Sequence, residues 1–262
     1  AYDEALAYAK DRKQFGKAII EFPAVYDMLA TIKAKLDAGR ALLYQTSRYV
    51  DIYKALDDIA RERKLTPEER QEQKRYAKLA GSFPPLAKGM NSEYANQNAY
   101  DCIQVHGGSG FMMEYACQRI YRDARITSIY EGTTQLQTVA AIRYVTNGSY
   151  AATLHEYELI PCAPEFEGYM NRIKDMTRKL EACTNAVKEA QNQELLDLVS
   201  RRLYEMAAVC VMSHLLLQDA TKAPDMFGKS LNVYVNYAES EVEKHFNFIR
   251  KFQAEELESY RK

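Results

Sequence analysis

The chain has 262 residues, of which 47% are hydrophobic and 27% are charged, the balance of a globular protein that can bury a core. With 35 basic and 36 acidic residues, the net charge of -1 provides no overall field that would attract nucleic acid or an anionic membrane surface. The sequence shows no secretory leader and no run of about 18 apolar residues. We therefore expect a cytoplasmic protein with no nucleic-acid partner and no membrane span.

The five cysteines and four histidines are scattered along the chain, without the close pairing that zinc ligands show. The odd number of cysteines indicates buried thiols in a reducing compartment. For the histidines, surface positions or hydrogen-bonded core positions are the default interpretation. The sequence therefore predicts no metal site.

Helical periodicity dominates the first part of the chain. A first helix is expected over residues 2–11, and because its pattern is already running at Ala1, we expect a fragment of a longer protein. After the polar RKQFGK, a long helix is expected from Phe22-Pro23 to about residue 50. Thr66-Pro67-Glu68-Glu69 begins another, since it combines an N-cap residue, a first-turn proline and two acids. Gly81–Pro85 is expected to interrupt that helix, with a further helix over residues 86–105 that HGGSG ends.

The second part of the chain is also helical in pattern. EYACQRIYRDARI predicts a short helix, and Thr134 and Gln137 have capping-box spacing at the start of a helix over residues 135–147. EYELIPCAPEFEG indicates a linker, and the apolar stripes beyond it predict three amphipathic helices. No segment alternates apolar and polar residues for long. The predicted class is all-α, with one helical domain over residues 1–150 and a second helical bundle over residues 151–262.

Glu131 is the most suggestive acid in the chain. In SIYEGTTQLQ it comes just before a predicted helix, whose positive end favours the charged carboxylate, whereas an apolar pocket would oppose it. Such competition can tune a general base. The alternative is a turn residue that accepts hydrogen bonds from loop amides.

Two further motifs could bind a ligand, but each also has a purely structural interpretation. The glycines of QVHGGSGF let a backbone approach a ligand closely, but they also suit a helix C-cap. The arginine and phenylalanine of RKQFG can pair with a phosphate and stack on a ring, but most such loops are only solvated.

In this order, RKQFG, QVHGGSGF and RDARITSIYEGTTQLQ resemble the C-terminal helical domain of the flavin-dependent acyl-CoA dehydrogenases, over residues 1–147. The resemblance implies oxidation of acyl-CoA thioesters to trans-2-enoyl-CoA with FAD as cofactor. Residues 151–262 are similar to an extension found in a longer bacterial subgroup. The family's N-terminal and middle domains have no counterpart in the sequence, so this fragment is expected to be inactive alone. The alternatives are an acyl-CoA oxidase and a non-catalytic oligomerisation or binding module of the same superfamily.

The resemblance also implies roles for single residues. Glu131 would be the catalytic base that removes the α-proton, and its backbone N–H would donate to the thioester oxygen. Tyr130 and Gly132 would border the substrate.

Several other residues would contact FAD, partly across a subunit interface. They are Arg12, Gln14, Phe15, Gln104, Gly107, Gly108, Thr133 and Gln135. Arg12 would meet the pyrophosphate, and Thr133 and Gln135 would lie near the base. A shared flavin implies a homodimer or homotetramer, and the chemistry implies electron-transfer flavoprotein or a similar acceptor.

Overall fold

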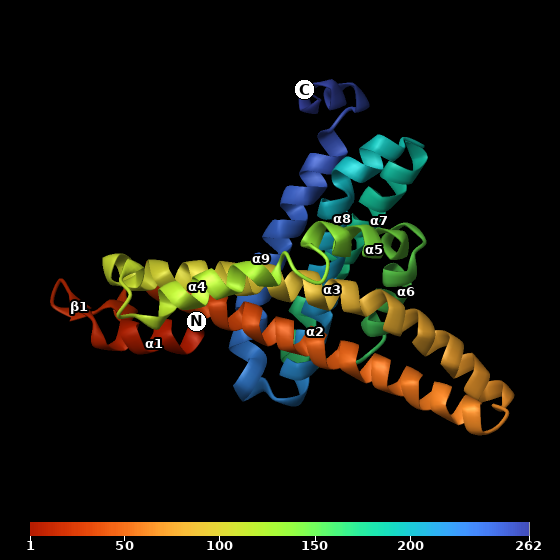
Figure 1. The fold of residues 1–262 in the computed structure, drawn as a ribbon, viewed down its shortest axis with the longest axis horizontal. Coiled ribbons are helices and arrows are strands. Elements are labelled where there is room, and N and C mark those ends of the chain that lie inside the picture. The colour runs from red at the N-terminus through yellow and green to blue at the C-terminus, as the bar shows by residue number, and fades with distance from the viewer. Residues whose placement is uncertain (262) are drawn as a thin grey trace.

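Long helices make up most of the computed structural model, which describes residues 1–261 (Figure 1). In chain order they are α1 (Tyr2–Asp11), α2 (Pro23–Glu62), α3 (Pro67–His106), α4 (Ala116–Thr127), α5 (Thr134–Thr146), α6 (Ser149–Glu158), α7 (Glu167–Glu189), α8 (Gln193–Lys222) and α9 (Pro224–Lys251). Short 3-10 turns lie at Ile19–Glu21, Gly107–Phe111, Pro164–Phe166 and Ala254–Tyr260. The strands β1 (Lys13–Gln14) and β2 (Lys17–Ala18) form one antiparallel hairpin. The all-α class is confirmed.

Two packed groups of helices build the fold. The longest pair, α2 and α3, lies side by side along the long axis, and α9 crosses it (Figure 1). α7, α8 and α9 pack on one another, which confirms the three amphipathic helices expected beyond the linker. Within residues 1–261, every helix is too short or too polar to cross a lipid bilayer.

The main hydrophobic core is shared between the two groups. It contains Leu42 of α2 and Phe83 of α3 together with Tyr204 of α8 and Tyr234 of α9, all fully buried. Residues on both sides of residue 150 contribute to this one core. The division of the chain into 1–150 and 151–262 therefore stays a prediction from the sequence. A smaller cluster packs α1 against the end of α3.

The expected break at Gly81–Pro85 is wrong, because α3 continues through Pro84 and Pro85. An internal proline removes a helical hydrogen bond at a cost of roughly 3 kcal/mol. Complete burial of Phe83 and Leu86 offsets this cost. Tyrosine hydroxyls from other helices donate to carbonyls beside the prolines, Tyr150 to Ser82 and Tyr204 to Pro85. The helix bends along its length instead of ending (Figure 1).

Two other boundaries differ from expectation. The segment EYELIPCAPEFEG, which was expected to be a linker, still belongs to α6 at its start, and the irregular stretch begins only after Glu158. The N-cap of α5 is Thr133 and not Thr134, since the Thr133 hydroxyl accepts from the Leu136 N–H at 3.2 Å. In contrast, the Thr66 cap is confirmed, and Glu69 forms a capping box with it.

Candidate functional site

A tight loop between α4 and α5 carries Glu131. The Thr134 N–H donates to the Ser128 carbonyl at 3.1 Å and so closes the loop at its base. Glu131 has φ 53° and Gly132 has φ 87°. A left-handed conformation at a residue with a side chain costs about 1–2 kcal/mol, so the surroundings must impose it on Glu131. The side chain itself is exposed.

Lys88 of α3 is the main contact that holds this loop. Its ammonium donates to the Tyr130 carbonyl at 2.9 Å and to the Gly132 carbonyl at 2.6 Å, the two carbonyls that flank Glu131. The Gln137 amide adds weaker bonds to the Glu131 and Gly132 carbonyls, at 3.3 and 3.4 Å. The loop backbone is therefore fixed from both sides while the Glu131 carboxylate stays free to act.

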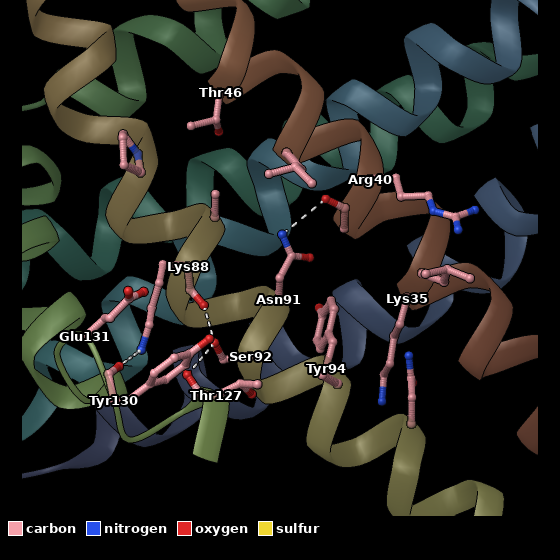
Figure 2. Close-up of a pocket in the computed structure, with 17 residues that line it drawn as sticks. Lys35, Arg40, Thr46, Lys88, Asn91, Ser92, Tyr94, Thr127, Tyr130 and Glu131 are labelled. Carbon is pink, nitrogen blue, oxygen red and sulfur yellow. Dashed lines mark hydrogen bonds between the residues drawn. The ribbon is translucent and has the colours of Figure 1, made fainter. Parts of the chain in front are cut away.

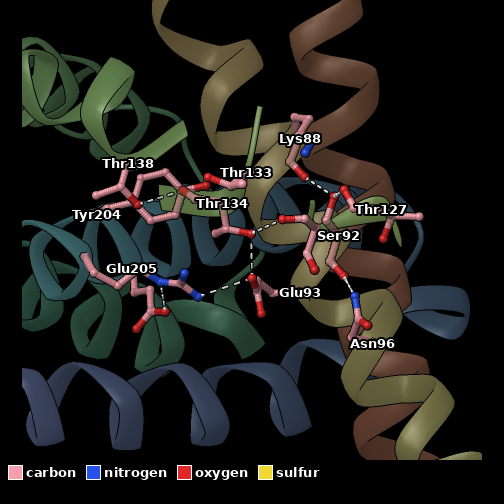
Figure 3. Close-up of polar contacts among 12 residues, drawn as sticks. Lys88, Ser92, Glu93, Asn96, Thr127, Thr133, Thr134, Thr138, Tyr204 and Glu205 are labelled. Atoms are coloured by element: carbon pink, nitrogen blue, oxygen red, sulfur yellow. Dashed lines mark hydrogen bonds and ion pairs between the residues drawn. The ribbon is translucent and has the colours of Figure 1, made fainter. Parts of the chain in front are cut away.

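One face of α3 contacts the end of α4, which leads into this loop. Lys88, Ser92 and Asn96 follow at four-residue spacing, which places them on one side of a helix. The Ser92 hydroxyl is 3.0 Å from the Thr127 carbonyl (Figure 3), and the Asn96 amide donates to the Ala124 carbonyl at 3.1 Å. Sequence reasoning missed all three residues. Their polar side chains at four-residue spacing were the available signal.

Glu131 and Tyr130 border a cavity of about 590 Å³ between α2 and α3. Figure 2 shows both residues at one end and Lys35 and Arg40 of α2 at the other. Lys35 is buried, and burial lowers its pKa, while its ammonium donates to the Gln97 amide oxygen at 2.8 Å. The cavity has mainly apolar walls, with cationic groups along its edge.

A second cavity, of about 520 Å³, lies between the β1–β2 hairpin and the end of α3. It brings together six of the residues expected at the cofactor: Arg12, Gln14, Phe15, Gln104, Gly107 and Gly108. The hairpin turn places Phe15 at φ 49° and Gly16 at φ 84°, the positive pair typical of a type I′ turn. Phe15 is 93% exposed, so its ring is available to another surface.

The glycine end of this cavity combines helix capping with open space. Gly107 is the C-cap of α3 with φ 59°, and nothing lies within 4 Å of where a Cβ would stand on Gly107 or Gly108. His106 beside them is buried and stacks on Tyr8 with ring centroids 4.2 Å apart. The motif therefore caps a helix and leaves an approach to its backbone open.

The two remaining cofactor candidates lie elsewhere. Thr133 and Gln135 are exposed at the N-terminus of α5, beside the Glu131 loop and outside the second cavity. Thr134, which was expected only to cap, is buried, and its hydroxyl donates to the Glu93 carboxylate at 2.6 Å. Glu93 is another functional candidate that sequence reasoning missed.

Within residues 1–261, no group of three or more His, Cys, Asp or Glu side chains could hold a metal ion. The cysteines are free thiols, and all are buried except the half-buried Cys162.

Two family models match successive parts of the chain. The family model for the acyl-CoA dehydrogenase C-terminal domain matches residues 1–144, and a second model, acyl-CoA dehydrogenase C terminal, matches residues 146–257. The caffeyl-CoA reductase-Etf complex subunit CarC of Acetobacterium woodii is 37% identical over 137 residues, which cover 52% of this chain and 30% of that protein. The probable acyl-CoA dehydrogenase FadE25 of Mycobacterium tuberculosis is 35% identical over 143 residues, 55% of this chain and 31% of that protein.

Among solved structures, an acyl-CoA dehydrogenase from Bacillus anthracis, complexed with FAD, matches with a TM-score of 0.71 at 21% identity. The match covers 99% of this chain and 47% of that one, and it shows a shared fold. The chain spans about a third of the length of the curated relatives it matches. Since the first family model alone matches more than half of its residues, the chain belongs to the acyl-CoA dehydrogenase family.

Proposed function

We propose that this chain is the base-bearing part of an FAD-dependent acyl-CoA dehydrogenase that oxidises acyl-CoA thioesters to trans-2-enoyl-CoA. The observation that carries the proposal is the Glu131 loop: its carboxylate is exposed at the edge of a largely apolar cavity, while Lys88 and Thr134 fix the backbone on either side. A general base needs such a fixed position, because small displacements from the reacting atom slow proton transfer strongly.

Glu131 would take the proton from the carbon next to the thioester carbonyl. That carbon is a weak acid, so the negative charge that develops on the carbonyl oxygen needs hydrogen-bond donors. The backbone N–H of Glu131 donates to no group within residues 1–261, which leaves it available for this oxygen. Gly132 keeps side-chain bulk away from the same place, and the half-exposed Tyr130 ring would border the acyl group.

The second cavity fits FAD in chemistry. The Arg12 guanidinium suits a pyrophosphate, and the amides of Gln14 and Gln104 suit a ribose or adenine edge. The open backbone at Gly107 and Gly108 permits close approach. When bound, FAD would accept the hydride that leaves the β-carbon.

The exposure of Phe15 supports a flavin that is shared between subunits, since this large ring stands on a strained turn and its edge-to-face contact with Phe22 covers little of it. We therefore propose a homodimer or homotetramer in which the hairpin of one subunit contacts the flavin of its partner. Thr133 and Gln135 would touch the same cofactor near the base.

An electron-transfer flavoprotein is the proposed electron acceptor. The name of the Acetobacterium woodii relative records an Etf complex for that protein. We extend this to the present chain on the strength of the shared family alone.

The test is anaerobic mixing of the full-length protein, loaded with FAD, with acyl-CoA thioesters of different chain length. Loss of the oxidised flavin absorbance together with a trans-2-enoyl-CoA product would support the proposal. When oxygen is then admitted, rapid reoxidation of the reduced flavin with release of hydrogen peroxide would assign an acyl-CoA oxidase instead. No bleaching with any thioester would contradict both and favour a non-catalytic module.

A companion measurement concerns the chain of 262 residues alone. If FAD is held between domains and subunits, this chain should bind no stoichiometric flavin. A yellow protein with one flavin per chain would contradict that arrangement.

A further inference from the structure

Thr134 closes the Glu131 loop with its side chain as well as with its backbone. It is the first residue of α5, and it is 4% exposed. Its N–H donates to the Ser128 carbonyl, and its hydroxyl donates to Glu93 Oε1 at 2.6 Å. The base of the loop is thus fixed to α3 through the Glu93 carboxylate.

Glu93 in turn is contacted by a residue from the C-terminal helices. Arg201 of α8 has Nη2 3.6 Å from Oε1 of Glu93, the oxygen that accepts from Thr134. Figure 3 shows Glu93 and Thr134. The Arg201 Nε donates to Glu205 at 2.5 Å, and the other Glu205 oxygen is 2.8 Å from Nε2 of His245 on α9. An unbroken series of polar contacts therefore joins α9 and α8 to the start of α5.

The charges in this series depend on one another. Glu93 and Arg201 each keep about a quarter to a third of their side-chain surface exposed. A half-buried carboxylate that loses its cation keeps the desolvation cost and loses the compensating attraction. Burial raises the pKa of Glu205, but the contacts with His245 and Arg201 outweigh it and hold the pKa below its usual range. Arg201 thus lies between two carboxylates and orients both.

We propose that Arg201 is a positioning residue for the Glu131 loop, acting through Glu93 and Thr134, so that residues 151–262 help to set where the base stands. The proposal rests on the proposed function, because the position of Glu131 matters to a reaction only if Glu131 takes part in it. It gives the C-terminal helices a part in the site, although they border neither the cavity at Glu131 nor the cavity at Arg12.

The experiment compares variants of the full-length, FAD-loaded protein by hydrogen exchange and by steady-state kinetics. Arg201→Met should make the Thr134 amide exchange about tenfold faster and lower kcat about tenfold, with KM changed less than about twofold. Arg201→Lys should recover part of both. Arg202→Met is the matched control, since Arg202 is the next residue of α8 and lies over the Phe248 ring.

A second pair of variants keeps the proposal testable if Arg201→Met fails to fold. Thr134→Val removes the hydroxyl at nearly constant shape, and Thr134→Ser restores it. Valine should reproduce the Arg201→Met phenotype, serine should not, and the double variant should be no worse than either single one, because both act on one series of contacts.

Unchanged exchange at Thr134 in Arg201→Met, or an equal effect of Arg202→Met, would overturn the proposal. These outcomes differ from a failure of the proposed function. If Glu131→Gln left flavin reduction intact while Arg201→Met still loosened the loop, the positioning contact would stand and the role of Glu131 would fall.

Discussion

Two loops of this protein share one backbone geometry and differ in almost everything else. The β1–β2 turn has Phe15 at φ 49° followed by Gly16 at φ 84°, and the site loop has Glu131 at φ 53° followed by Gly132 at φ 87°. Around Glu131, Lys88, Gln137 and Thr134 hold the backbone. Around Phe15, the turn relies on its own short hairpin, and the ring is exposed apart from an edge-to-face contact with Phe22.

The difference teaches how strain in a loop is supported. At Glu131 the chain itself supplies hydrogen bonds that compensate for the backbone strain, so the loop holds the carboxylate in position without a partner subunit. At Phe15 the strained residue presents a large apolar ring that its own chain leaves almost wholly exposed, which is expected where a partner surface completes the site.

Of the substitutions that test this comparison, loss of Lys88 should have the largest effect. Lys88→Met removes both bonds to the carbonyls flanking Glu131, so kcat should fall by about a hundredfold through misplacement of the base. Lys78→Met, an exposed lysine of the same helix, is the control and should leave kcat within about twofold. Equal rates for the two variants would mean that the loop keeps its position without Lys88.

The two glycines separate backbone strain from crowding. Alanine at either position must adopt positive φ, which should lower the free energy of unfolding by about 1 kcal/mol. At Gly132 the new Cβ would also lie 2.8 Å from the Gln137 amide nitrogen, whereas nothing lies within 4 Å at Gly16. Gln137 can swing away, but it then loses its weak bonds to the loop carbonyls, so urea unfolding should show Gly132→Ala to be about 0.5 kcal/mol less stable than Gly16→Ala. Matching losses would show that the site loop is as open as the hairpin.

The smallest effect on stability is expected at Phe15. Because its ring is 93% exposed, Phe15→Ser should change the free energy of unfolding by less than about 0.5 kcal/mol. In the assembled, full-length protein the same change should weaken FAD retention, which gel filtration followed by flavin absorbance would measure. A large loss of stability with normal flavin content would assign Phe15 to the fold and not to a partner.

Much of the fold could be predicted from local patterns. Thr66 and Glu69 indicate the start of α3, and the apolar stripes indicate α7 to α9, because capping and periodicity are local signals. Pro84 and Pro85 misled because their cost is offset by buried neighbours and by tyrosine hydroxyls far away in sequence.

The site was predictable to a similar degree. Its motifs could be picked out, and the structure brings six of the cofactor candidates into one cavity. The roles of Lys88, Glu93 and Arg201 could not be predicted, since each depends on contacts between residues at least 41 positions apart that only the packed helices create.

The most direct test of the central claim is the rate of anaerobic flavin reduction in the full-length Glu131→Gln protein mixed with a good acyl-CoA substrate. Glutamine keeps the size of the side chain and removes its basicity, so bleaching should slow by about a thousandfold while thioester binding persists. Bleaching within about tenfold of the native rate would contradict the account and require another base.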